Sequence, residues 1–214
     1  MESEAYNLVE KAEKKIKTGF LGGLFSSKES RMEEALELYQ KAGNIFKLNK
    51  KWAEAGECFE KCGNLEESLK ADPTSHFQDA SHCYSFMDKR KSYDVLQKCL
   101  KIYQNQGRFQ MAGKMEKQIA EDFESELKYN EAIQSYRKAA EYFSMESLNS
   151  KSYEQGCLLK VADLMCENNH PEAYKEAKVI YEKIAMQYLS VPLLKSSAKD
   201  LFFKSVVVHL TFDV

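Results

Sequence analysis

The sequence contains few of the residues that interrupt helices: three prolines and nine glycines among 214 residues. A fold built from many short strands needs frequent tight turns rich in these residues, so their scarcity disfavours an all-β fold. No apolar run approaches the roughly 20 residues of a membrane-spanning helix. The formal net charge of −2 excludes a globally basic nucleic-acid binder, and we expect no nucleic-acid partner.

Motifs for catalysis and for cofactor binding are also missing. The chain has no GxGxxG or GxxxxGK[ST] phosphate loop, no GxSxG and no HExxH. The six cysteines include no CxxC pair and residues 1–17 do not resemble a signal peptide, so we expect reduced thiols in a cytosolic protein. Cys58 and Cys62 could share a helix face and, with His82 and Cys83 downstream in the sequence, form a zinc site, but free cysteines are more often small buried hydrophobes. We therefore expect no enzyme activity, no cofactor and no metal.

Apolar residues recur at helical spacing through almost the whole chain, in a composition of 43% hydrophobic and 30% charged residues that is typical of globular proteins. A first helix is predicted at 3–17. A second begins at a capping box formed by Ser30 and Glu33 and ends at about 47–49, and a third runs from about 51 to a break at Gly63-Asn64. Further helices are predicted after Pro73, and then, beyond a turn at 88–90, at 93–103, 108–127, 130–145, 150–168, 171–189 and 193–210.

A pattern of small and aromatic residues repeats along these helices. Ala-x3-Tyr-x2-Ala-x3-Phe occurs at 35–46 and again at 132–143, and the looser Ala-x3-Tyr-x3-Ala-x2-Tyr occurs at 177–188. Small residues let helices approach closely while the aromatic rings fill the space beside them. This alternation is typical of tetratricopeptide (TPR) helix pairs. The sequence therefore predicts a single all-α, TPR-like solenoid of antiparallel helix hairpins over residues 1–214.

One segment departs from this pattern: Phe20-Leu21-Gly22-Gly23-Leu24-Phe25. Paired glycines resist helix formation, so we expect a loop over residues 18–30 between the first two helices. Loops lie at the surface, and an exposed loop with four large apolar side chains requires an apolar partner such as a membrane. Burial against the neighbouring helix pair is the alternative. The predicted membrane contacts are Phe20, Leu21, Leu24 and Phe25.

Basic residues recur near helix ends in the second half of the chain. For any one of them, a solvated helix face is the simpler interpretation. Together, on a curved solenoid, they predict a basic stripe that faces an acidic partner. The residues concerned are Arg108, Lys114, Lys117, Lys160, Lys195, Lys199 and Lys204.

Several stretches of the chain resemble the soluble NSF attachment protein family, of the α/β type called Sec17 in yeast. The similarity spans essentially the whole chain. The matching runs are EKAEKK at 10–15, FLGGLF at 20–25, AGNIFK at 42–47, WAEAG at 52–56, GRF at 107–109, CLLKVA at 157–162 and PLLKSSAKDLFFK at 192–204.

The resemblance implies an adaptor of vesicle-mediated transport. Family members bind laterally to the four-helix SNARE bundle, formed by syntaxin-type and other SNAREs, through one face of a twisted, curved sheet of helical hairpins. They then present the bundle to the hexameric ATPase NSF, which takes it apart. The resemblance further implies a cytoplasmic protein held peripherally at membranes by its N-terminal loop.

The resemblance also assigns site residues. Arg108 and Lys114 match positions that the family uses for SNARE contact, and Lys160, Lys195 and Lys199 are further candidates. At another basic family position this chain has Gly156. That substitution weakens the expected patch there, although Lys151 lies close enough in the sequence to compensate.

Family members continue for several helices beyond the Phe-Phe-Lys run at 202–204 and end in an acidic tail that stimulates NSF. By this resemblance we expect SNARE and membrane binding with impaired NSF stimulation, and an uncovered apolar face on the last helix. Two alternatives stay open from the residues themselves. One is a generic TPR scaffold that binds a peptide in its concave groove, and the other is a peripheral membrane protein whose main functional element is the N-terminal loop.

Overall fold

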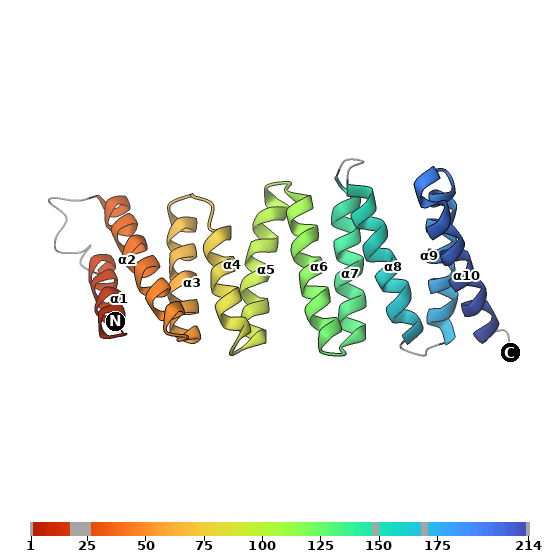
Figure 1. The fold of residues 1–214 in the computed structure, drawn as a ribbon. Helices are drawn as coiled ribbons and strands as arrows, with labels where there is room; N and C mark the ends of the chain where they lie inside the picture. The colour runs from red at the N-terminus through yellow and green to blue at the C-terminus, as the bar shows by residue number, and fades with distance from the viewer. Residues whose placement is uncertain (1, 18–26, 147–149, 168–170, 213–214) are drawn as a thin grey trace. The chain divides into compact units, whose positions relative to one another are not determined.

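In the computed structural model, residues 2–17, 27–146, 150–167 and 171–212 are described, and every regular element among them is helical (Figure 1). This confirms the predicted all-α fold class. The helices are α1 (Glu2–Lys17), α2 (Lys28–Leu48), α3 (Trp52–Ser68), α4 (Thr74–Ser85), α5 (Lys89–Asn105), α6 (Phe109–Ser125), α7 (Tyr129–Ser144), α8 (Lys151–Glu167), α9 (Pro171–Leu189) and, after a 3₁₀ turn at Pro192–Leu194, α10 (Lys195–Phe212).

The chain divides into two compact units, residues 1–102 and 103–214, and α5 runs from the first into the second. In the first unit α2 packs against α1, α3 against α2 and α4 against α3, and in the second unit α6 to α10 pack against one another in the same sequential order. Neighbouring helices within a unit run antiparallel, because their connections are short (Figure 1). Each unit is thus a stack of TPR-like helical hairpins. A single solenoid over 1–214 and its curvature stay predictions.

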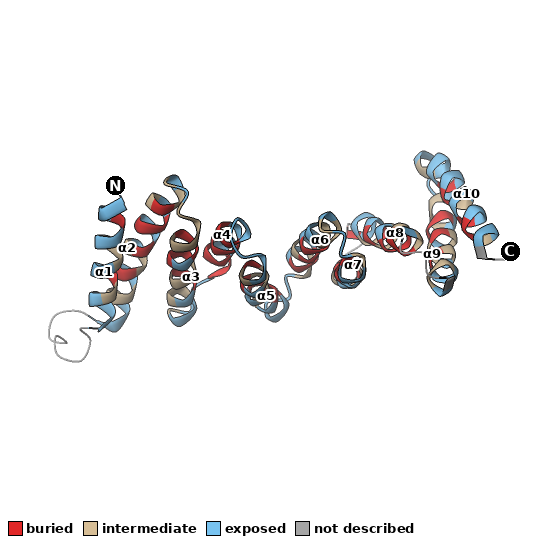
Figure 2. Cartoon of the chain, turned by 90° about the horizontal axis from the view of Figure 1, so that it is seen from below, coloured by how far each residue is buried: buried red, intermediate tan, exposed pale blue. Residues whose placement is uncertain are grey.

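The predicted alternation of alanine and aromatic residues forms the core of each unit. In α2, Ala35 and Ala42 are fully buried, and Tyr39 and Phe46 are exposed by no more than 2%. Figure 2 shows that the buried residues of each helix are those turned toward its neighbours. The equivalent residues of the second unit are buried as well: Ala132, Tyr136, Ala139, Phe143, Ala177, Tyr181 and Ala185.

The start of α2 differs from the prediction. The helix begins at Lys28, and the Ser27 side chain caps it by accepting a hydrogen bond from the Ser30 amide at 3.1 Å. Ser27 satisfies an amide that would otherwise lack a partner at the helix start. The predicted capping box at Ser30 and Glu33 is therefore wrong, and residues 28–30 belong to the helix rather than to the predicted loop.

Two predicted breaks are also wrong. Helix α3 continues through Gly63-Asn64 to Ser68, because Gly63 allows close packing: a Cβ atom there would lie 2.5 Å from Cε1 of Phe77. The turn predicted at 88–90 already contains the start of α5, where Asp88 Oδ1 accepts a hydrogen bond from the Lys91 amide at 3.0 Å. By contrast, Gly107 ends the α5 segment as predicted, with a left-handed φ of 67°.

Candidate partner-binding surface

The basic residues predicted to contact a partner all belong to three helices of the second unit. Arg108 directly precedes α6 and Lys114 lies on it, Lys160 lies on α8, and Lys195 and Lys199 lie in the first turns of α10; all five are exposed. These helices run in the same direction because an antiparallel helix separates each from the next (Figure 1). The predicted cations are therefore presented by alternate helices of one unit.

Arg108 and Lys114 are each placed over an aromatic ring. The guanidinium of Arg108 lies 4.7 Å from the ring centroid of Tyr103 and donates to the Gln106 side chain at 3.2 Å. Lys114 Nζ lies 6.0 Å from the ring of Tyr153 on α8. Such cation–π contacts hold a charged group in place while leaving it accessible. The two rings therefore position both cations on the surface that an acidic partner would meet.

Lys160 has a different environment, because it is tied to a carboxylate. Its Nζ lies 2.7 Å from Glu124 Oε1 on α6, and Glu124 Oε2 accepts a hydrogen bond from Tyr136 Oη on α7 at 2.6 Å. A lysine, a carboxylate and a buried tyrosine from three consecutive helices thus form one cluster. The lysine and the carboxylate link α8 to α6 across the intervening helix.

The same arrangement recurs further along this unit. Tyr181 Oη of α9 donates to Asp163 Oδ1 of α8 at 2.6 Å, and Lys204 of α10 lies 2.6 Å from the same oxygen. Lys204 Nζ also lies 5.4 Å from the Tyr181 ring centroid. We call each such cluster a Lys–carboxylate–Tyr bridge. A pocket of about 500 Å³ lies over this second bridge, with Phe203 on its wall.

The first unit contains a complete bridge and a related cluster. Tyr84 Oη donates to Glu60 Oε2 at 3.0 Å, and Lys98 Nζ donates to Glu60 Oε1 at 2.7 Å. In the related cluster, Lys61 Nζ of α3 lies 3.1 Å from Glu13 Oε1 of α1 and 5.0 Å from the Tyr39 ring centroid.

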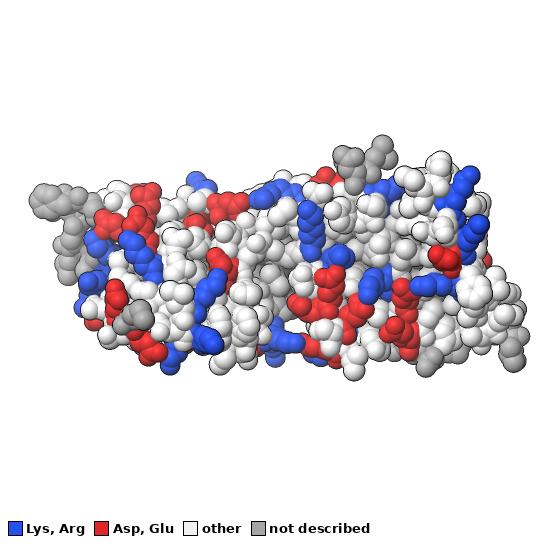
Figure 3. Space-filling view, viewed as in Figure 1, with Lys and Arg blue, Asp and Glu red and all other residues white. Residues whose placement is uncertain are grey.

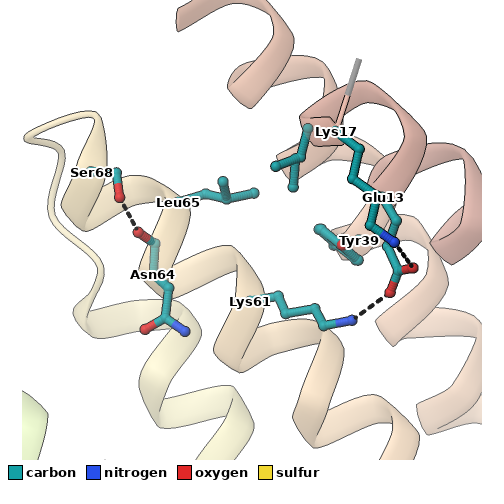
Figure 4. Close-up of a pocket in the computed structure, with 8 residues that line it drawn as sticks. Glu13, Lys17, Tyr39, Lys61, Asn64, Leu65 and Ser68 are labelled. Atoms are coloured by element: carbon teal, nitrogen blue, oxygen red, sulfur yellow. Dashed lines mark hydrogen bonds and ion pairs between the residues drawn. The ribbon is translucent and has the colours of Figure 1, made fainter. Parts of the chain in front are cut away.

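Figure 4 shows this cluster beside a pocket of about 390 Å³, where Glu13 and Lys61 meet over Tyr39. The bridges are therefore a repeated feature of the hairpin stack rather than a property of the predicted site alone.

The bridges shift the proton affinities of their members. Burial and the neighbouring carboxylate raise the pKa of Tyr136 and of Tyr181, so both phenols stay protonated donors. Burial acts to raise the pKa of Glu124, but hydrogen bonds from Lys160 and Tyr136 hold it below its ordinary value. The hydrogen bond to Glu124 raises the pKa of Lys160. The pair therefore stays fully ionised around neutral pH.

The surface over the second unit is mixed in charge rather than uniformly basic. Basic and acidic side chains lie beside one another over α6, α8 and α10 (Figure 3), and Lys117 pairs with Glu121 at 3.0 Å. Lys114, Lys195 and Lys199 form no ion pair with any residue that the structure describes. Acidic groups of a partner can reach these three directly, whereas they must compete with Glu124 for Lys160.

The structure also bears on the other predicted sites. Phe20, Leu21, Leu24 and Phe25 lie outside the described residues. Lys151 opens α8 and is exposed, as the compensating role for Gly156 requires.

All six cysteines are free, and burial raises the pKa of Cys58 and Cys62 to about 12, which makes them unreactive at neutral pH. Within the described ranges, no cluster of three or more potential metal ligands is present, and no helix is long and apolar enough to cross a membrane.

The repeat pattern in the sequence identifies two of the bridge tyrosines, but not the carboxylates and lysines that pair with them. Tyr136 and Tyr181 were expected only to fill space between helices, and the equivalent Ala80-x3-Tyr84 was overlooked. The carboxylate partners lie 24, 12 and 18 residues from their tyrosines. Because these separations follow helix and loop lengths, no fixed spacing could have revealed the pairs.

Comparison with known proteins places the chain in a family. The family model described as "Soluble NSF attachment protein, SNAP" matches residues 3–214. The α-soluble NSF attachment protein of Mus musculus is 37% identical over 218 residues, which cover 100% of this chain and 72% of that protein. The β-soluble NSF attachment protein of Bos taurus is 39% identical over 217 residues, which cover 99% of this chain and 71% of that protein.

A yeast relative and a solved structure are less similar to this chain. The vesicular-fusion protein SEC17 of Komagataella phaffii is 30% identical over 216 residues, covering 99% of this chain and 72% of that protein. Among solved structures, that of BtubC from P. vanneervenii is similar over 97% of this chain and 87% of its own chain, at 13% identity and a TM-score of 0.44. On the family model and the sequence relatives, this chain belongs to the soluble NSF attachment protein family.

Proposed function

We propose that this protein is a non-catalytic adaptor that binds assembled SNARE four-helix bundles at membranes and recruits the NSF ATPase to them. Its principal support is the family match over residues 3–214, since relatives are named for attachment of NSF and for vesicular fusion. The contact surface consists of Arg108, Lys114, Lys160, Lys195 and Lys199. Its exposed cations suit the acidic surface of a helical bundle.

Membrane association forms the second part of the proposal. The loop that contains Phe20, Leu21, Leu24 and Phe25 contacts the bilayer and holds the protein on the cytosolic face, beside membrane-anchored SNAREs. Each large apolar side chain that is fully buried contributes roughly 1.5–3 kcal/mol, and partial insertion contributes less. The loop therefore raises the local concentration of the adaptor without fixing it permanently.

The bundle contact is tested with soluble SNARE bundle and charge reversals. Arg108→Glu with Lys114→Glu should weaken binding by roughly a hundredfold or more, because two attractive contacts become repulsive. The matched control, Lys175→Glu with Lys183→Glu, makes the same charge change on exposed residues of α9 and should change binding far less. Equal binding by both variants and the wild type would refute the assigned surface.

Vesicle binding and NSF recruitment require their own measurements. Phe20→Ser with Phe25→Ser should reduce binding to vesicles while sparing binding to soluble bundle. NSF should sediment with bundle only when this protein is present. If no bundle binding occurs under any condition, the protein is instead a general helical-repeat scaffold or a membrane-binding protein.

A further inference from the structure

A cluster of rings joins two inter-helix turns of the first unit. The indole of Trp52, at the start of α3, stacks on the ring of Phe86, which follows α4; their centroids are 4.3 Å apart and their planes meet at 19°. His82 meets Phe86 edge-on at 5.2 Å. The Phe86 side chain is nevertheless 54% exposed. The stacking therefore fixes the orientation of an apolar surface that stays open to solvent.

Two further apolar side chains extend this surface. Leu48, the last residue of α2, is 82% exposed, and Met87, next to Phe86, is 67% exposed. The turns that follow α2 and α4 lie at the same end of the hairpins of this unit (Figure 1). We call Leu48, Trp52, His82, Phe86 and Met87 the aromatic tip.

Basic residues border the aromatic tip on both turns. Lys50 and Lys51 connect α2 to α3, and Lys89, Arg90 and Lys91 open α5. Lys50, Lys89, Arg90 and Lys91 are exposed or partly exposed, and Lys50 is held in a left-handed conformation with a φ of 57°. Five cations thus stand beside one exposed apolar surface.

The acidic side chains near these turns are engaged within the protein. Asp88 Oδ1 accepts a hydrogen bond from the Lys91 amide, and Glu57 Oε1 lies 3.9 Å from Lys91 Nζ. Glu54 accepts a hydrogen bond from Tyr6 Oη at 3.2 Å. Lys50, Lys51 and Arg90 have no ion pair with any residue in the described part of the chain. The border of the tip therefore attracts anions.

We propose that the aromatic tip inserts into the headgroup region of an anionic lipid bilayer. Its apolar side chains stand at the ends of helices, where they protrude, and a fluid bilayer adapts to a protruding surface. Tryptophan favours the membrane interface, and each nearby lysine or arginine adds to the attraction toward anionic lipid. An acidic peptide shares the charge preference, but its apolar anchors fit grooves better than protruding turns.

This contact is separate from the loop of the proposed function and does not depend on it. Helix α2 has 21 residues and begins at Lys28, whereas the tip includes its last residue, Leu48. A helix of this length extends roughly 30 Å. If both ends of α2 contact one bilayer, the helix lies along the membrane plane rather than upright on it.

Trp52 is the only tryptophan of the chain, so its fluorescence reports on the tip alone. The wild-type protein is titrated with vesicles of phosphatidylcholine and with vesicles of phosphatidylcholine mixed with phosphatidylserine. With the anionic vesicles, Trp52 emission should shift to shorter wavelength and should be quenched when the acyl chains carry bromine. Anionic vesicles that bind the protein but leave Trp52 unshifted and unquenched overturn the proposal.

Paired variants test which side chains carry the binding. Phe86→Ser with Met87→Ser should weaken binding to anionic vesicles by about tenfold or more. Lys50→Glu with Arg90→Glu should weaken binding to anionic vesicles by about the same factor. The control Lys41→Glu with Lys70→Glu makes the same charge change away from the tip and should stay within about threefold of the wild type.

The outcomes separate this inference from the proposed loop contact. Folding of each variant is checked by circular dichroism and by binding to soluble bundle. If Phe20→Ser with Phe25→Ser abolishes vesicle binding while the tip variants bind as the wild type does, the loop contact stands and the tip proposal is overturned. If the tip variants lose vesicle binding and Trp52 is quenched, the tip proposal is supported whatever the loop variant does.

Discussion

Tyr136 and Lys160 hold opposite oxygens of the same carboxylate. Tyr136 Oη donates to Glu124 Oε2 at 2.6 Å, and Lys160 Nζ donates to Glu124 Oε1 at 2.7 Å. The tyrosine is fully buried, whereas the lysine is exposed. One carboxylate therefore couples the helix core to the surface proposed to meet the SNARE bundle, and changes at Glu124 should alter both stability and binding.

The buried hydrogen bond from Tyr136 to Glu124 should contribute to the free energy of unfolding. Tyr136→Phe keeps the ring but removes the donor to a charged acceptor, which should cost about 1.5–3 kcal/mol of the free energy of unfolding. The measurement is urea denaturation followed by circular dichroism. Tyr153→Phe is the matched control, because that side chain is 45% exposed and its ring stacks on Phe143. A loss in the control as large as that in Tyr136→Phe would remove the bridge as the cause.

The exposed ion pair between Lys160 and Glu124 should affect the affinity for the SNARE bundle. Glu124→Gln removes the internal competitor for Lys160, so affinity for the acidic SNARE bundle should rise by about two- to fivefold at low salt. Lys160→Ala should lower it. The gain should shrink as salt is added, because screening weakens exposed charge interactions. A titration of bundle binding at two ionic strengths provides the measurement, and weaker binding by Glu124→Gln would mean that the carboxylate positions the lysine instead.

Another carboxylate of α6, that of the fully buried Glu116, should have the opposite effect on stability. It is 1% exposed, Oε1 has no hydrogen-bond partner among the described residues, and Lys138 Nζ lies 3.9 Å away. Burial raises the pKa of Glu116 above 4.5, against the influence of Lys138 and Ser135. The folded state then holds its proton more tightly than the unfolded state, so stability falls as pH rises from the unfolded pKa through the raised folded one.

Glu116→Gln should remove this pH dependence. The variant should gain on the order of 1 kcal/mol over the wild type at neutral pH, because a neutral amide costs less to bury than a carboxylate. The difference between the two proteins should shrink as the pH falls from neutral through the raised pKa of folded Glu116, and should level off near 4.5, the ordinary pKa of the group. Urea denaturation across that range measures it. A constant difference at every pH would show that ionisation of Glu116 plays no part.

The sequence predicted the helical core well because that part of the fold depends on local periodicity. Alanine and tyrosine four residues apart identify the same buried face in α2, α7 and α9, and the structure places them there. The helix end predicted at Gly63 was wrong, whereas the one at Gly107 was right. Gly63 weakens a helix taken alone, but within the stack it provides room for the Phe77 ring, and packing outweighs the local preference.

The candidate site was predicted only in part. The exposure of Arg108 and Lys114 follows from the sequence, because charged residues near helix ends are rarely buried. The pairing of Lys160 with Glu124 does not, since it depends on how α8 meets α6 across α7. The aromatic tip was missed for the same reason: Trp52 begins α3 and Phe86 follows α4, and the two rings meet only when these helices pack antiparallel.

Two helical glycines provide a direct test of the packing argument. At Gly156 in α8, an added Cβ meets nothing within 4 Å, so Gly156→Ala should stabilise the protein by up to about 1 kcal/mol through helix propensity. At Gly63 in α3 the same atom would lie 2.5 Å from the Phe77 ring. Gly63→Ala should therefore destabilise the protein by about 1–3 kcal/mol, because the propensity gain is outweighed by overpacking. Denaturant unfolding of both variants decides the matter: if both are stabilised, α3 and α4 do not pack as closely as the structure indicates.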